Sequence, residues 1–93
     1  MLQFDPAALT VQSEDGVVAK LTRKEFEILS CLIKALPSGI SPDDLRKQVW
    51  GNLAVVDKSL DVHLFKLRKK LAPLRYQVRL EKNYCYLLVH EEE

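Results

Sequence analysis

The segment "DKSLDVHLFKLRKKLAPL", residues 57–74, decides the fold. At 100° per residue its leucines form one narrow stripe, which predicts an amphipathic helix that buries Leu60, Leu64, Leu67 and Leu71. The opposite face carries Lys58, Ser59, Val62, Lys66 and Lys69. It is flanked by Lys70 and His63 on one side and by Phe65 and Asp61 on the other. Many cationic helix faces only keep a protein soluble, so the rest of the chain must decide the role of this one.

The distribution of charge separates this region from the rest of the chain. Residues 58–82 carry eight basic and two acidic side chains, a net charge of +6, whereas the remaining residues carry six basic and eleven acidic ones, a net charge of −5. The overall charge of +1 therefore hides a basic third and an acidic remainder. This asymmetry is typical of a protein that presents one face to a polyanion.

Length and composition favour a single globular domain. The 93 residues suffice for one hydrophobic core and are too few for two domains. No apolar run approaches the roughly 20 residues of a membrane span, and the first residues lack the pattern of a signal peptide, so the sequence predicts a cytoplasmic protein. Cys31 and Cys85 show no metal-ligand spacing, and we expect both to be small core residues. The sequence predicts neither a metal site nor a cofactor.

The first third of the chain predicts a small sheet followed by a helix. Alternating apolar and polar residues, interrupted at Asp15-Gly16, indicate three antiparallel strands near 2–4, 8–13 and 16–21. Thr22 and Glu25 form a capping box, in which hydroxyl and carboxylate satisfy free amides at a helix start. Helical spacing then predicts a buried face of Phe26, Leu29, Ile33 and Leu36.

Two further helices and a hairpin complete the pattern. Pro37 and Gly39 end the first helix, Ser41 caps the second, and Pro73 stops the cationic third. Apolar residues of the second helix predict a buried face of Leu45, Val49 and Trp50. Residues 76–81 alternate and "NYCYLLV" returns, with Asn83 at the tip because Asn tolerates a positive φ. The predicted fold is therefore α+β in one domain, 1–93, with a sheet (1–21), three helices (22–73) and a hairpin (74–90). This order describes a winged helix-turn-helix, whose third helix enters a DNA major groove while the hairpin reaches phosphates or a minor groove.

Three segments resemble the OmpR/PhoB-type effector domains of bacterial two-component response regulators. "LTRKEFEIL" (21–29) is similar to the family's L-T-x-x-E-F-x-L-L, and "SPDDLRKQVWG" (41–51) to its S-x-x-x-L-x-x-x-V-W-G. "KSLDVHLFKLRKKL" (58–71) resembles its recognition helix, R-T-V-D-V-H-I-x-x-L-R-K-K-L. The match covers nearly the whole chain in order and spacing. It implies a transcription regulator that binds specific double-stranded DNA.

The resemblance also implies roles for individual side chains. Base reading would fall to Lys66, Val62, Ser59 and Phe65. Lys66 is the first choice because an ammonium can approach guanine O6 and N7, and Val62 would meet a thymine methyl. Phosphate binding would fall to Lys58, Arg68, Lys69, Lys70, Arg79 and Lys82.

Two of these positions have a second interpretation. Arg68 lies toward the core side of the helical wheel, so pairing with Asp61 or Glu25 is the alternative to a phosphate contact. His63 matches a family histidine, but its flanking position favours packing or hydrogen bonding over base reading.

The chain also departs from the family pattern. Phe65 stands where the family usually has arginine, so this position offers a stacking or apolar contact, or a dimer surface. The wing motif T-V-R-G-x-G-Y is replaced by "LEKNYCY" (80–86), which loses the arginine fork and both glycines. We expect Tyr84 and Tyr86 to be packing residues of the hairpin.

The family implies further partners. Its loop between the second and third helices touches RNA polymerase, and the corresponding residues are Gly51, Asn52, Leu53, Ala54, Val55 and Val56. The alternative for this loop is that its apolar side chains tuck under the helices. The family further implies a covalently attached receiver domain, absent from these residues, and a homodimer on direct-repeat sites spaced by about 10 bp.

Other functions find less support in the sequence. An enzyme needs convergent titratable groups, and the chain has neither a nucleophile motif nor a Gly-rich phosphate loop. RNA binding would call for aromatic residues available for base stacking. The alternative that stays open is a winged-helix module for protein–protein interaction, which an exposed apolar recognition face would favour.

Overall fold

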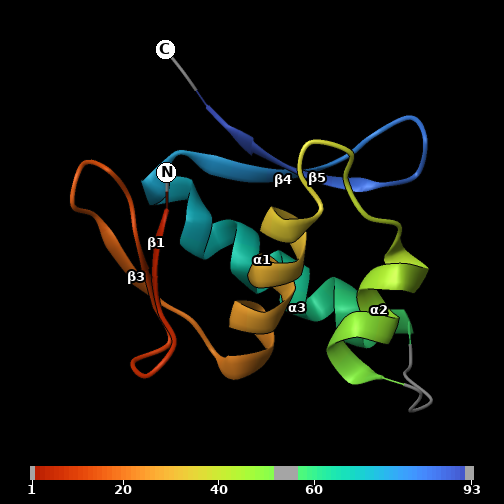
Figure 1. The fold of residues 1–93 in the computed structure, drawn as a ribbon, viewed down its shortest axis with the longest axis horizontal. Coiled ribbons are helices and arrows are strands. Elements are labelled where there is room, and N and C mark those ends of the chain that lie inside the picture. The colour runs from red at the N-terminus through yellow and green to blue at the C-terminus, as the bar shows by residue number, and fades with distance from the viewer. Residues whose placement is uncertain (1, 52–56, 92–93) are drawn as a thin grey trace.

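The computed structural model describes residues 2–51 and 57–91, and the side chains of residues 57–59 lie outside this description. Strands β1 (Gln3–Asp5), β2 (Thr10–Gln12) and β3 (Val18–Lys20) precede helices α1 (Arg23–Lys34), α2 (Pro42–Trp50) and α3 (Asp57–Leu71). A 3-10 turn, η1 (Ala72–Leu74), leads into the hairpin of β4 (Tyr76–Leu80) and β5 (Tyr86–His90). The predicted winged helix-turn-helix is confirmed in the type and order of its elements (Figure 1).

The N-terminal sheet is antiparallel in the order β1-β2-β3. Val11 at its centre pairs with Phe4 on one side and with Ala19 on the other, and its side chain is fully buried. The three predicted strands are therefore confirmed, each shorter than expected or shifted by a residue. In Figure 1 this sheet lies beside α1 and α3, at the end of the molecule away from α2.

Both predicted helix caps are present. The Thr22 hydroxyl accepts from the Glu25 amide at 3.2 Å, and the Glu25 carboxylate accepts from the Thr22 amide at 2.9 Å, which closes the capping box. The Ser41 hydroxyl accepts from the Asp44 amide at 3.2 Å and caps α2. These bonds satisfy amides that have no partner within the helix, so they fix where α1 and α2 begin.

The core forms where α1, α3 and the hairpin meet. The four leucines of the predicted α3 stripe are fully buried, which confirms that stripe: Leu60, Leu64, Leu67 and Leu71. The predicted face of α1 is partly wrong, because Leu36 is 39% exposed whereas Ile28 and Leu32 are buried. Cys31 is partly buried and packs against this core, as expected of a small core residue, whereas Cys85 is half-buried in the hairpin and lies outside the core cluster.

The hairpin is attached to the connection between α1 and α2. The Ile40 amide donates to the Tyr86 carbonyl at 3.0 Å, and the Tyr86 amide donates to the Ile40 carbonyl at 2.7 Å. Gly39 precedes this bridge at a φ of +84°, and a Cβ there would lie 2.8 Å from the Tyr86 carbonyl oxygen. Only glycine fits this approach without displacing backbone. The bridge therefore fixes the wing relative to the helices.

Within the described residues, no helix combines the length and the apolarity needed to cross a lipid bilayer.

Candidate nucleic-acid interface

Helix α3 presents an exposed surface opposite its leucine stripe. Val62 is 50% exposed and Phe65 58% exposed, and Lys66 and Lys69 are exposed beside them. We call these four residues the outward face of α3. Its exposure follows from the sequence period, since residues off the leucine stripe must point to solvent. The face combines two ammonium groups with two apolar side chains.

The aromatic ring on this face is held by a neighbouring cation. Lys69 Nζ lies 4.4 Å from the centroid of the Phe65 ring, one helical turn away. Such a cation–π contact favours one orientation of an otherwise free ring and keeps positive charge next to it. Phe65 is therefore an apolar contact point beside a cation, where the family usually offers a guanidinium.

Lys70 reaches in the opposite direction, toward α1. Its Nζ lies 2.6 Å from Oε1 of Glu25, whose side chain is fully buried. Burial alone would raise the pKa of Glu25, but hydrogen bonds from Lys70 and from the Thr22 amide more than offset it and hold that pKa below its ordinary value of 4.5. The pair joins α3 to the start of α1. Lys70, which was predicted to bind phosphate, thus forms an internal salt bridge with Glu25.

Arg68 links α3 to the wing. Its Nε donates to the Val78 carbonyl of β4 at 3.1 Å, and its guanidinium lies 6.0 Å from the Tyr86 ring centroid. The alternative role predicted for Arg68 was pairing with Asp61 or Glu25. In the structure the Arg68 side chain donates to a backbone carbonyl instead. The contact ties α3 directly to the hairpin.

His63 lies where α2 meets α3. Its ring is 5.8 Å from the Trp50 ring at a tilt of 43°, and Lys24 Nζ lies 5.4 Å from that Trp50 ring. Lys24 also donates to the Val49 carbonyl at 3.3 Å. These contacts agree with the packing role expected for His63.

The tip of the wing closes through its backbone. The Glu81 amide donates to the Cys85 carbonyl and the Tyr84 amide to the Glu81 carbonyl, both at 2.9 Å. Asn83 Oδ1 accepts from the Cys85 amide at 3.2 Å. Asn83 lies at the tip as predicted, but the residue of the tip at positive φ is Tyr84 (φ 60°), so the positive φ expected for Asn83 was wrong. The side chain of Asn83 stabilises the turn instead.

The two wing tyrosines differ in environment. Tyr86 is 8% exposed and belongs to the core, as predicted. Tyr84 is 75% exposed, so the prediction that it packs within the hairpin was wrong. Arg79 and Lys82 are exposed on the same hairpin. The wing therefore presents two cations and an aromatic ring to solvent.

Several predicted site residues fall outside the described part of the chain. The side chains of Lys58 and Ser59 do, and so does most of the predicted polymerase loop, residues 52–56. Gly51 is described: it is exposed, its φ is 68°, and its amide donates to the Lys47 carbonyl at 2.8 Å to end α2.

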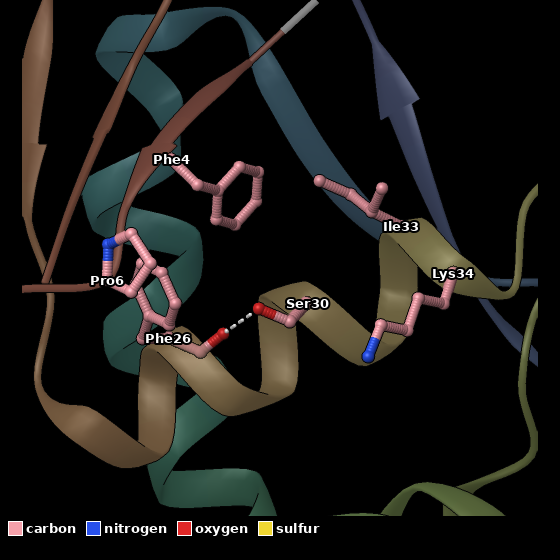
Figure 2. Close-up of a pocket in the computed structure, with 6 residues that line it drawn as sticks. All are labelled: Phe4, Pro6, Phe26, Ser30, Ile33 and Lys34. Atoms are coloured by element: carbon pink, nitrogen blue, oxygen red, sulfur yellow. Dashed lines mark hydrogen bonds between the residues drawn. The ribbon is translucent and has the colours of Figure 1, made fainter.

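A separate hollow of about 260 Å³ lies between α1 and β1. Its walls are mainly apolar, with Phe4 packed edge-to-face on Phe26 at 5.3 Å between ring centroids. Figure 2 shows Phe4 and Ile33 on opposite sides of the hollow, and Ser30 Oγ donating to the Phe26 carbonyl at 2.9 Å. None of the predicted DNA-contact residues lines it. Among the described residues there is also no cluster of His, Cys, Asp and Glu that could hold a metal ion.

Comparison with known proteins gives one consistent result. Residues 16–88 match the model of the family described as "Transcriptional regulatory protein, C terminal". The chain is 37% identical over 83 residues to the DNA-binding dual master transcriptional regulator RpaA of Synechocystis, covering 83% of this chain and 34% of RpaA. It spans about a quarter to a third of the length of the curated relatives it matches.

Solved structures agree with this result. The DNA-binding domain of Bacillus subtilis CssR superimposes with a TM-score of 0.76 at 26% identity, covering 96% of this chain and all of that one. The DNA-binding domain of Klebsiella pneumoniae RstA, solved in complex with the RstA box, gives 0.74 at 29% identity, covering 95% and 90%.

Proposed function

The chain belongs to the family of C-terminal domains of transcriptional regulatory proteins, the DNA-binding domains of OmpR/PhoB type, and from this membership we propose that α3 reads specific base pairs in a major groove while the β4–β5 wing contacts the backbone or the minor groove. Domains of this family regulate transcription and are not enzymes. The remaining assignments in this subsection follow from that docking.

One observation carries the proposal. The outward face of α3 is exposed while the opposite stripe of leucines is fully buried, so the four side chains of that face are free to reach DNA. Because the major groove accommodates one helix, the elements flanking α3 then face the phosphates. Arg79 and Lys82 on the exposed side of the wing provide the charge that such a position requires.

The residues of α3 and the wing that are assigned to DNA divide into base-reading and phosphate-binding groups. Lys66 donates to guanine O6 or N7, Val62 and Phe65 meet thymine methyls or other apolar base edges, and Ser59 completes the reading set. Lys58, Lys69, Arg79 and Lys82 bind phosphates, which adds affinity without sequence choice. Phosphate contacts by Arg68 and Lys70 stay predictions that compete with the internal contacts of both side chains.

The partners of the full-length protein are also part of this proposal. A receiver domain attached to this one, a homodimer on direct repeats, and a contact between the 51–56 loop and RNA polymerase follow from family membership. A protein that regulates bacterial genes in this way works in the cytoplasm.

The exposed aromatic residues favour one alternative function. Phe65 and Tyr84 are both more than half exposed, as in a surface that binds another protein. The lysines beside them favour DNA, because the core of a protein interface is depleted of lysine. A winged-helix interaction module therefore remains the second candidate.

The test is selection of the domain against a random pool of duplex DNA at near-physiological salt. We expect enrichment of one motif, present as a direct repeat with about one helical turn between half-sites. Salt-sensitive binding without enrichment would contradict sequence-specific recognition and favour the interaction module.

A variant pair then tests the reading role of Lys66. Lys66→Ala should lose about 1 to 3 kcal/mol of discrimination at one base pair. Lys20→Ala, which removes an exposed lysine from β3, is the matched control and should leave the motif unchanged. An unaltered motif for Lys66→Ala would remove Lys66 from the reading set.

A further inference from the structure

The tip of the wing carries a bulky residue in a backbone conformation that bulky residues avoid. Tyr84 has a φ of 60°, in the left-handed region where a Cβ crowds the backbone. Three hydrogen bonds hold the conformation: Glu81 to Cys85, Tyr84 to Glu81, and Cys85 to the side chain of Asn83. The turn is therefore closed around Tyr84 despite the unfavourable φ.

The Tyr84 side chain contributes little packing that could offset this unfavourable backbone conformation. It is 75% exposed, the highest value among the exposed large hydrophobic residues of the described chain. Leu80 at the end of β4 is 53% exposed, and Lys82 beside it is also exposed. A strained backbone that presents an aromatic ring to solvent suggests a role in binding.

We propose that Tyr84 is a minor-groove contact of the wing, which packs its ring against deoxyribose and donates its hydroxyl to adenine N3 or thymine O2. This inference rests on the proposed function. The minor groove offers these acceptors at A·T pairs, whereas G·C pairs add the guanine N2 amine, which blocks a donor. Lys82 binds the adjacent phosphate and brings the ring to the groove. Tyr84 therefore makes the domain prefer A·T at the base pair under the wing tip.

Replacing guanine by inosine tests this minor-groove contact separately from base reading in the major groove. Inosine·C pairs look like G·C in the major groove but lack the N2 amine in the minor groove. The assay measures affinity for the duplex selected by the wild-type domain, with the base pair flanking the α3 site as A·T, G·C or inosine·C. The wild type should bind the A·T and inosine·C duplexes alike and the G·C duplex about tenfold more weakly.

Two variants separate the ring from the hydroxyl. Tyr84→Phe should keep most of the affinity and lose the preference between A·T and G·C. Tyr84→Gly should lose the preference and bind about tenfold more weakly, although its melting temperature stays equal or rises, because glycine accepts the positive φ. A loss of binding without a loss of stability excludes a merely structural role.

The outcomes are distinguishable. If the wild type binds its selected duplex and Tyr84→Gly binds it equally well, the inference fails while the proposed function stands. A wild type that treats inosine·C like G·C also overturns it. If the wild type selects no sequence at all, the proposed function and this inference fail together.

Discussion

Replacing Lys70 by methionine should destabilise the domain strongly. The substitution keeps the length of the side chain and removes the ammonium 2.6 Å from Glu25. The Glu25 carboxylate is fully buried, and among the described residues its Oε2 has no hydrogen-bond partner. Without Lys70 the carboxylate loses its ammonium partner and keeps the hydrogen bond from the Thr22 amide, at 2.9 Å.

The magnitude follows from the burial of the two partners. Removing one member of a fully buried pair costs about 3 to 5 kcal/mol because the other charge is left uncompensated. The Lys70 side chain is 36% exposed, so water partly replaces it, and we expect a loss of about 2 kcal/mol. For a domain of this size that loss lowers Tm by about 10 °C.

Thermal and urea unfolding measure this effect, with Lys69→Met as the control. Lys69 is exposed and contacts the Phe65 ring, so its replacement should change the unfolding free energy by less than about 0.5 kcal/mol. A Lys70→Met domain as stable as this control would refute the reasoning. The double variant Glu25→Leu/Lys70→Met should recover much of the loss, because no buried charge remains.

A comparison of Lys70→Met with Lys69→Met also tests the phosphate contact predicted for Lys70. If Nζ stays with Glu25 on DNA, Lys70→Met leaves the salt dependence of binding unchanged, whereas Lys69→Met lowers its slope by about one unit. An equal drop for both variants would show that Lys70 also reaches a phosphate.

Three further predictions concern the wing and the capping box. Lys82→Ala should weaken binding to all sequences alike and flatten the salt dependence, and a loss confined to one sequence would contradict a phosphate contact. Glu25→Gln should be less stable than wild type at neutral pH by about 1 kcal/mol. Since the folded pKa of Glu25 is lowered, its stabilisation is complete above 4.5 and lost as the pH falls through that lower pKa, so the two unfolding curves should converge in acid. Gly39→Ala should lose about 2 kcal/mol in urea unfolding, because its Cβ would lie 2.8 Å from the Tyr86 carbonyl oxygen at a positive φ; an unchanged midpoint would show that the backbone shifts freely.

The parts of the fold that the sequence predicts well are those set by local rules. The four leucines of α3 repeat at helical spacing and are all buried, and Thr22, Glu25 and Ser41 make the expected caps. Each of these features depends on residues within one element, so their spacing alone defines them.

The errors occur where distant segments meet. The capping box predicts Glu25 as a cap residue, but it does not predict that α3 approaches Glu25 and supplies Lys70 as its partner. The predicted α1 face missed Ile28 and Leu32, which are buried in a helix that packs against α2, α3 and β5. The bridge between Ile40 and Tyr86 joins positions far apart in the chain, and Gly39 was the one local signal of a close approach.

The wing shows a different limit. Asn is the better residue for a positive φ, so propensity placed Asn83 there, but the hydrogen bonds of the turn put Tyr84 in that position. Conformational propensity is a property of one residue type. The hydrogen bonds of the 81–85 turn instead determine which of two neighbouring residues, Asn83 or Tyr84, takes the positive φ.

If α3 and the wing dock on DNA as proposed, the hydrogen bond from Arg68 to Val78 also affects which DNA the domain prefers. Helix and wing cannot separate without breaking this bond, so the span between them is set before any encounter. A duplex must then match that span or bend to meet it, and the energy of bending differs between stiff A-tracts and flexible pyrimidine–purine steps. In the proposed complex, this contact and the Ile40–Tyr86 bridge would extend sequence choice to base pairs that no side chain touches.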